Sequence, residues 1–156
     1  MKTKSSIKAS ATILRLQNIL VPIDFSNHSR KALGYAIPLA AQSGARITLL
    51  HVVGKTVVYP AEMSVVIPNE TQTIASARKH LATLGQRWIP RSMLGKMLVE
   101  VGEPFDEITR LARKLKAGLI ICTTHGYTGL AHVLLGSTAE RIVRHAPCPV
   151  LTIKVR

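Results

Sequence analysis

Five short apolar runs limit how this chain can fold more than any other feature of its sequence. They are separated by longer stretches that contain polar, helix-forming residues, glycines and prolines, and the fourth run is apolar throughout. Runs of this kind are typical of strands that are buried on both faces of a parallel sheet. The five predicted strands are Asn18–Ile23, Arg46–Val53, Met97–Val101, Gly118–Cys122 and Val150–Lys154.

The stretches between these strands carry apolar residues at helical spacing. One helix is predicted after Ser26, which can cap it, with a kink at Pro38. The other predicted helices are about Glu70–Arg87, a helix that opens at Pro104, and Ser137–His145. The inner faces of the first and last helices are expected to include Ala41 and Val143. Strands that alternate with helices predict a parallel sheet with crossovers on both faces, and segment 54–69 is expected to form a mobile loop over the sheet edge.

Composition places the chain among single domains with an aliphatic core. Its 156 residues fit one domain, and 47% hydrophobic against 19% charged residues exclude a disordered chain. Aromatic residues are only 4%, so aliphatic side chains must fill the core. The two cysteines, Cys122 and Cys148, are too few for a disulfide framework and match no metal-ligand spacing. No apolar run approaches the roughly 18 residues that a membrane helix needs.

The balance of charge is strongly basic, with a net charge of +13 from 21 basic and 8 acidic residues. Such a charge attracts polyanions, but the cations are spread along the chain without a zinc-finger spacing or an RNA-binding aromatic signature. We therefore expect only nonspecific contact with nucleic acid. Residues 1–16 are expected to form a basic tail, although an organelle presequence would look similar. The tail lacks the apolar stretch of a secretory signal, which favours a cytoplasmic location.

Candidate binding residues follow the predicted strands. In open α/β sheets, ligands lie beyond the carboxyl ends of the strands. This sequence places there Asp24, Val52, Gly102 and the turn Thr123–Gly126, followed by the pair Gly136–Ser137. A glycine followed by the first amides of a helix suits an anion, because those N–H groups and the helix dipole favour negative charge. The two glycines, ten positions apart, would hold a polyphosphate from two sides.

Structural roles compete with binding at several of these positions. The residues from Ser137 to Glu140 read Ser-Thr-Ala-Glu, a capping box in which the serine caps its own helix, with or without a phosphate contact. Asp24 has the alternative role of capping the helix that follows it. His51 is expected to be a packed strand residue. His125 is expected to be a polar loop residue rather than a general base, because no nucleophile or carboxylate partner lies beside it.

A glycine motif near the C-terminus resembles the nucleotide motif of the universal stress protein family. It reads Thr123-Thr124-His125-Gly126, nine further residues and then Gly136-Ser137. The resemblance extends from about residue 18 to residue 154 and is clearest in Ile19–Ser26 and Gly136–Val150. There is one departure, because the first of the three motif glycines falls on Thr123. A branched side chain there could obstruct a ligand or donate a hydrogen bond to it.

The resemblance implies a fold, a ligand and an assembly. The fold is an open five-stranded parallel sheet of order 3-2-1-4-5 with helices on both faces, of the adenine nucleotide alpha hydrolase-like type, over residues 17–156. The ligand is ATP, or AMP or ADP, with Mg²⁺ as a candidate companion. The assembly is a homodimer through the apolar edge strand Val150–Lys154, whose open hydrogen-bonding groups invite pairing. The residues that the resemblance assigns to the nucleotide are Pro22, Asp24, Val52, Thr123, His125, Gly126, Gly136, Ser137 and Thr138.

We expect a stress-response regulatory protein that works as an adenine-nucleotide binding module. One alternative is a slow ATPase or phosphotransferase that uses the same pocket, and another is a family member that has lost nucleotide binding. Strong catalysis is not indicated, because the glycine motif contains no lysine and no acidic pair stands ready for a metal ion.

Overall fold

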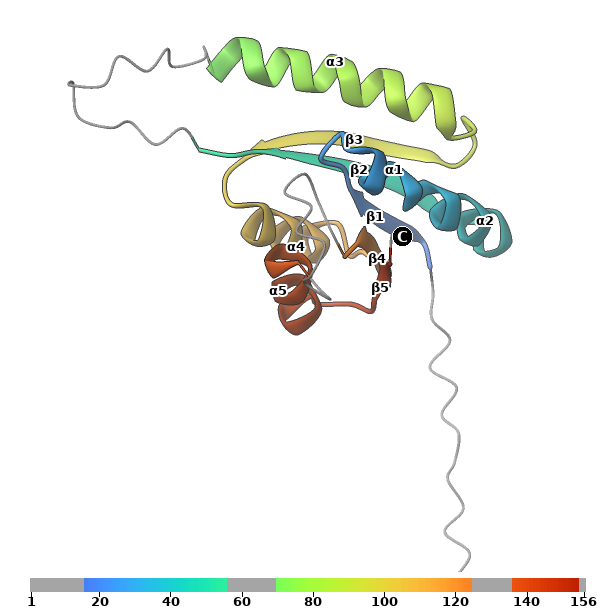
Figure 1. The fold of residues 1–156 in the computed structure, drawn as a ribbon. Coiled ribbons are helices and arrows are strands. Elements are labelled where there is room, and N and C mark those ends of the chain that lie inside the picture. The colour runs from blue at the N-terminus through green and yellow to red at the C-terminus, as the bar shows by residue number, and fades with distance from the viewer. Residues whose placement is uncertain (1–15, 56–69, 125–135, 155–156) are drawn as a thin grey trace, which may run out of the picture.

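The computed structural model describes residues 16–55, 70–124 and 136–154. Within these residues, five strands form a single sheet, and five helices lie on its two faces (Figure 1). The expected basic tail, apart from Leu16, and most of the expected loop 54–69 lie outside the described residues.

The five strands pair in the order β3-β2-β1-β4-β5, and every pair is parallel. This order and direction confirm the fold class that was predicted from the strand pattern and the family resemblance. The strands are β1 (Asn18–Pro22), β2 (Arg46–Val53), β3 (Leu94–Val101), β4 (Leu119–Thr123) and β5 (Val150–Ile153).

Strand β1 lies at the centre of the sheet and is buried on both faces. Ile19, Leu20 and Val21 have no exposed surface. Because side chains alternate along a strand, Ile19 and Val21 join one hydrophobic cluster and Leu20 joins another on the opposite face. The wholly apolar sequence of the strand therefore follows from its position.

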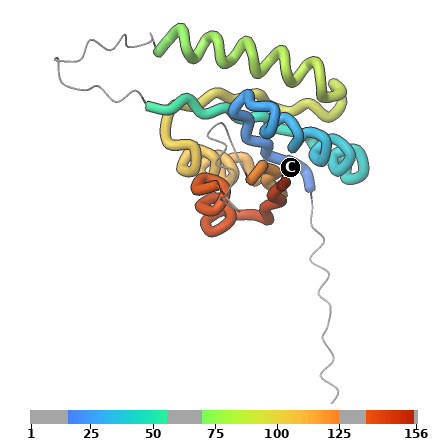
Figure 2. Tube along the Cα trace, in the orientation of Figure 1, coloured from blue at the N-terminus to red at the C-terminus, as the bar shows by residue number. Residues whose placement is uncertain are grey.

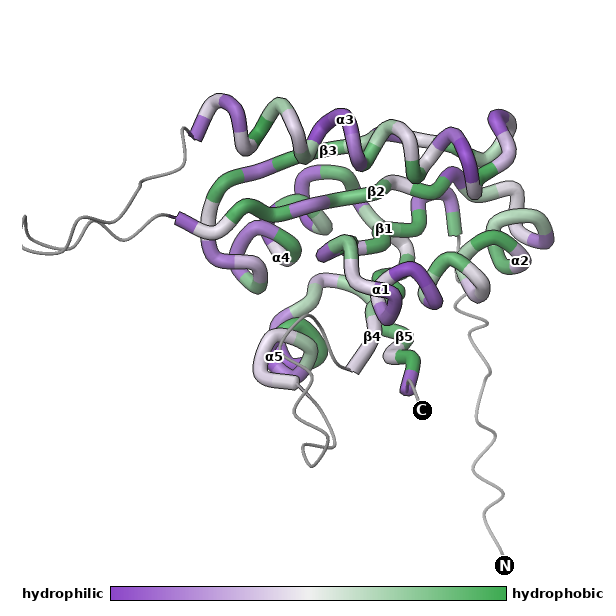
Figure 3. The backbone as a smooth tube through the Cα atoms, turned by 45° about the horizontal axis from the view of Figure 1, so that its top comes forward, coloured by the Kyte–Doolittle hydropathy of each residue, from purple (hydrophilic) through white to green (hydrophobic). Residues whose placement is uncertain are grey.

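Two layers of helices cover the sheet (Figures 1 and 2). Leu33 of α2 and Leu81 of α3 pack against one face, while Ile108 of α4 and Ile142 of α5 pack against the other. In Figure 3 the central strands are largely hydrophobic, whereas α1 is hydrophilic along its length. The helices are α1 (Asn27–Lys31), α2 (Leu33–Ser43), α3 (Glu70–Trp88), α4 (Pro104–Lys114) and α5 (Ser137–His145).

The helix predicted after Ser26 is divided into two. Its break lies at Ala32, whose N–H donates to the Ser29 carbonyl three residues earlier, 3.2 Å away, rather than to a carbonyl four residues earlier. Pro38 lies inside α2 without ending it. Two inward positions were also predicted wrongly, since Ala41 and Val143 are exposed. Each follows a buried residue and is turned about 100° from it around the helix.

Strand β3 begins three residues earlier than the sequence pattern predicted, at Leu94 rather than Met97. The sequence pattern did not predict this extension because it contains Gly95, and glycine is generally unfavourable in strands. Here it is required by a close approach, since a Cβ atom on Gly95 would lie 2.9 Å from the carbonyl oxygen of Ile47 on β2. The pairing of β2 with β3 shifts its register between Ile47 and Leu49, at the same place.

Replacing Gly95 with alanine should therefore destabilise the protein. The added methyl group meets backbone rather than a flexible side chain, so we expect a loss of about 1–3 kcal/mol in the free energy of unfolding. Gly34→Ala is the matched control. Gly34 lies in α2 with nothing within 4 Å of the added Cβ, and alanine should stabilise the helix there by about 0.5–1 kcal/mol. Urea unfolding followed by circular dichroism measures both variants, and equal effects of one sign would contradict the close approach at Gly95.

Candidate functional site

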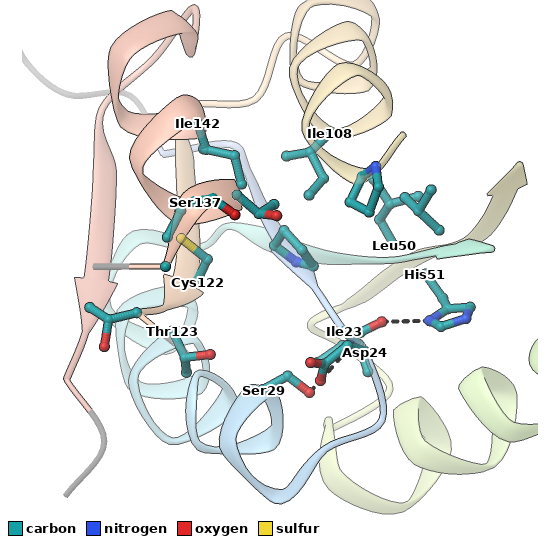
Figure 4. Close-up of a pocket in the computed structure, with 17 residues that line it drawn as sticks. Ile23, Asp24, Ser29, Leu50, His51, Ile108, Cys122, Thr123, Ser137 and Ile142 are labelled. Atoms are coloured by element: carbon teal, nitrogen blue, oxygen red, sulfur yellow. Dashed lines mark hydrogen bonds between the residues drawn. The ribbon is translucent and has the colours of Figure 1, made fainter. Parts of the chain in front are cut away.

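A cavity of about 330 Å³ opens at the carboxyl ends of β1, β2 and β4 (Figure 4). The strand order reverses at this place, because the chain leaves β1 toward β2 on one side while β4 lies on the other. Open parallel sheets bind ligands at such a switch point, and the volume is within the range of small-molecule sites. The lining residues are Pro22, Ile23, Asp24, Ser29, Leu50, His51, Val52, Pro104, Ile108, Cys122, Thr123, Thr124, Gly136, Ser137, Thr138, Ala139 and Ile142.

The fold brings together every predicted nucleotide-binding residue that the structure describes. They come from four separate stretches of the chain and all line this one cavity; they are Pro22, Asp24, Val52, Thr123, Gly136, Ser137 and Thr138. His125 and Gly126 lie outside the described residues. The shared location follows from the parallel strands, and the binding role of each residue stays a prediction.

Asp24 is fixed at the cavity by the turn that leads into α1. Its carboxylate oxygen Oδ1 accepts a hydrogen bond from the N–H of Ser26 at 2.9 Å, and its own N–H donates to the hydroxyl of Ser29 at 3.3 Å. The cap of α1 is Ser26, as predicted, since its hydroxyl accepts from the N–H of Ser29 at 3.0 Å. The capping role considered for Asp24 is therefore wrong, and its carboxylate instead holds the turn that precedes the cap.

The N-terminus of α5 differs from the predicted capping box. Gly136 is the N-cap, with extended backbone, so Ser137 is already the first helical residue and does not occupy the capping position. Glu140 does not reach back to the helix start, and its carboxylate pairs with Arg144 at 2.8 Å. The first N–H groups of a helix have no acceptor within it, and here they belong to residues that line the cavity. An anion is the ligand that such a helix end favours.

Gly136 also has a packing role. Its N–H donates to the carbonyl of Thr124 at 2.7 Å, and a Cβ atom on Gly136 would lie 2.8 Å from that same oxygen. Only glycine permits this approach without displacing backbone. The contact ties the start of α5 to the end of β4, so the anion-favouring helix end is held at the switch point of the sheet.

Thr123, the position that departs from the family motif, is the last residue of β4. It is half-buried and lines the cavity, where Figure 4 shows it beside the end of the strand. Its strand partner on β5 is Ile153. A threonine side chain therefore adds both volume and a hydroxyl group to a wall where a glycine would leave only backbone.

Several lining residues were not predicted from the sequence. His51 was interpreted as a packed strand residue, and its ring does stack on Phe25 with centroids 4.2 Å apart, but it also lines the cavity. Its position immediately before Val52, at the carboxyl end of β2, was a signal that could have identified it. Ile108 and Ile142 come from α4 and α5, and nothing in a single sequence indicates that these two helices close over the same opening.

The floor of the cavity contains a buried thiol. Burial raises the pKa of Cys122 from an ordinary value of 9.0 to about 11.

Among the described residues, Asp24 is the only acidic side chain in the lining. No group of three His, Cys, Asp or Glu side chains that could hold a metal ion occurs in residues 16–55, 70–124 and 136–154. In the same part of the chain, no helix is long and apolar enough to cross a membrane.

Fold and cavity together define a parallel α/β protein with an anion-favouring helix end at its switch point. The model of the universal stress protein family matches residues 15–154. The chain therefore belongs to the universal stress protein family. A universal stress protein of Methanocaldococcus jannaschii is 36% identical to it over 148 residues, which cover 88% of this chain and 82% of that protein.

Solved structures of the family share the fold. UspA from Lactobacillus plantarum has a TM-score of 0.70 at 25% identity and covers 89% of this chain and 98% of its own. A universal stress protein in complex with cAMP has a TM-score of 0.65 at 24% identity, covering 89% and 97%. Another, from Archaeoglobus fulgidus in complex with dAMP, has a TM-score of 0.61 at 20% identity, covering 90% and 99%.

The raised pKa of Cys122 predicts slow alkylation in the folded protein. Only the thiolate reacts, and with a pKa of about 11 the thiolate fraction at pH 8 is about one in a thousand. In a Cys148→Ser variant, Cys122 is the only thiol. Its reaction with iodoacetamide, followed by mass spectrometry, should accelerate about tenfold per pH unit between pH 8 and pH 10. The same variant in urea should show an ordinary thiol titration, and a plateau above pH 9 in the folded protein would contradict the buried position.

Proposed function

We propose that this protein binds an adenine nucleotide in the cavity and acts as a binding module. The observation that carries the proposal is the placement of two unlike recognition groups around one opening. The Asp24 carboxylate and the N-terminus of α5 at Ser137 lie on different sides of it (Figure 4). A carboxylate accepts hydrogen bonds from hydroxyl and amino groups, whereas a helix N-terminus favours a phosphate. A nucleotide carries both kinds of group.

The apolar lining supports the same ligand. Pro22, Leu50 and Val52 line the cavity as apolar side chains, which suits the faces of a purine ring. We assign the nucleoside to the side of Asp24 and Val52, and the phosphate to Gly136, Ser137 and Thr138. The two ligand complexes of the family support adenine as the base, since cAMP and dAMP have adenine and one phosphate group in common. A triphosphate such as ATP, with or without Mg²⁺, is the finer form of this proposal.

The alternative functions differ in what they require of the site. A slow ATPase or phosphotransferase needs groups that stabilise charge at the transferred phosphoryl, and Asp24 is the only acidic side chain in the described lining. The presence of a single acidic side chain in this lining favours nucleotide binding without catalysis.

A regulatory role in stress, exerted in the cytoplasm through nucleotide occupancy, is part of the proposal. A member that has lost nucleotide binding is the other alternative, and the threonine at position 123 is the residue that favours it.

Calorimetry with substituted proteins tests the proposal by separating the two halves of the ligand. Asp24→Asn keeps an oxygen for the Ser26 N–H but removes the charge, so adenosine and AMP should both bind about tenfold more weakly. Ser137→Ala should weaken AMP but leave adenosine unchanged. Ser43→Ala, at the exposed end of α2, is the control that should change neither.

Nucleotide binding by the unmodified protein is the first measurement. Absence of binding to AMP, ADP and ATP at millimolar concentration would contradict it. Thr123→Gly then identifies the reason, because recovered binding would show that the threonine blocks the site, as the loss alternative requires.

We also propose that two copies pair through β5. This strand lies at the edge of the sheet and bonds only to β4 among the described strands. The carbonyls of Pro149 and Ile153 accept hydrogen bonds from β4, so the alternating pattern of a strand directs the N–H of Thr152 to the outer edge. An edge with open backbone groups can pair with a second copy about a two-fold axis.

The net charge of +13 would act on nucleic acid only nonspecifically.

Replacing Thr152 with proline should abolish this dimer without disturbing the pairing of β5 with β4. Proline removes the outward N–H, which is a tolerated change at a strand edge. A lysine at Ile153 would be a poorer test, because that side chain is buried in the core. Light scattering should give half the mass of the unmodified protein, with Thr152→Val as a control that remains dimeric. A monomeric unmodified protein at tens of micromolar would contradict the dimer.

A further inference from the structure

His51 contacts both residues that flank Asp24. Its ring atom Nδ1 lies 2.7 Å from the carbonyl oxygen of Ile23, the residue before Asp24 (Figure 4). Its ring stacks on Phe25, the residue after Asp24, with centroids 4.2 Å apart and an angle of 34° between the planes. The two contacts come from one side chain on the neighbouring strand, so β2 holds the backbone on each side of the carboxylate.

The hydrogen bond to Ile23 determines which ring nitrogen carries a proton. A carbonyl oxygen only accepts, so Nδ1 of His51 must be the donor. In the neutral ring, Nε2 is then left with the lone pair. The contact extends the pairing of the two strands, since the N–H of Ile23 already donates to the carbonyl of Leu50 at 2.8 Å.

Phe25 needs the support that the ring of His51 gives. Its φ of +64° is in the left-handed region, which a bulky residue rarely adopts. Such a conformation persists only where the surroundings hold it, and it is found most often at functional sites. The Phe25 ring also makes a T-shaped contact with His80 of α3, with centroids 5.8 Å apart, and it packs against the core cluster that contains Leu81.

Asp24 itself is held by the turn into α1, through Ser26 and Ser29. These bonds fix the carboxylate relative to α1. The contacts of His51 add a side-chain connection to β2, on which Val52 also lines the cavity.

We propose that His51 is a positioning residue that sets the place of Asp24 relative to β2, acting through Nδ1 and through its ring face rather than by contact with the ligand. The inference rests on the proposed function in so far as Asp24 recognises the nucleoside. It assigns to His51 a contribution to adenosine affinity and none to phosphate affinity.

Three substitutions in the full-length chain separate positioning from direct contact. The amide of His51→Asn occupies the place of Nδ1, whereas the amide of His51→Gln reaches the place of Nε2, and His51→Phe keeps the ring without a donor. We expect His51→Gln, which keeps neither contact, to bind adenosine about tenfold more weakly, and His51→Phe and His51→Asn, which each keep one contact, to bind it about threefold more weakly. All three should bind inorganic pyrophosphate as the unmodified protein does. Recovery by glutamine and not by asparagine, or unchanged adenosine affinity in all three, would overturn the proposal.

Two measurements without ligand keep the test independent of the proposed function. Nitrogen chemical shifts of the His51 ring should report a proton on Nδ1 in the unmodified protein. The amides of Asp24 and Ser26 should exchange with solvent faster in His51→Phe and His51→Asn, which each lose one contact, and fastest in His51→Gln. A proton on Nε2 alone, or unchanged exchange in His51→Phe, would overturn the positioning role. If these signatures are present while the unmodified protein binds neither adenosine nor pyrophosphate, the proposed function fails and the positioning of Asp24 stands.

Discussion

The parallel pairing of β1 with both β2 and β4 is the constraint on which the rest of the structure depends. A strand bonded on both edges and covered on both faces must be apolar, and the three central residues of β1 have no exposed surface. Because connections between parallel strands are right-handed, the chain crosses one face of the sheet on its way to β2 and the other face in the second half. The loops after β1 and β4 therefore diverge, and the cavity forms between them. The ligand site is a consequence of the strand order.

Close backbone approaches hold parts of the fold together, and one of them lies at this cavity. The contact of Gly136 with the carbonyl of Thr124 holds the start of α5 against the end of β4, whereas the contact of Gly95 with Ile47 holds β3 against β2 at the opposite end of the sheet. A glycine in a binding motif is usually explained by its ligand. Gly136 shows that the same residue can be required by packing, so its presence alone does not separate a protein that binds a nucleotide from one that has lost this ability.

Some polar side chains around the cavity are placed by local contacts, and others are placed by contacts between separate segments. Ser26 caps α1 within a few residues of itself, and this was predictable because a cap depends on local sequence. Ser137 was predicted as a cap on the same grounds, but the N-cap is one residue earlier, at Gly136, which is tied to the end of β4. A contact between segments overrode the local signal, and it left the Ser137 hydroxyl beside the cavity instead of in a cap.

The sequence by itself determined the strand and helix pattern, the parallel class of the sheet, and the candidate site residues near the carboxyl ends of its strands, because periodicity and the carboxyl-end rule act on neighbouring residues. It also determined, through its resemblance to a family, the strand order. Only the tertiary structure decided the break at Ala32, the exposure of Val143 and the place of His51 between Ile23 and Phe25. The place of His51 depends on which residues meet across distant segments. The residues next to a side chain in the sequence do not indicate which carbonyl or ring that side chain contacts in another segment.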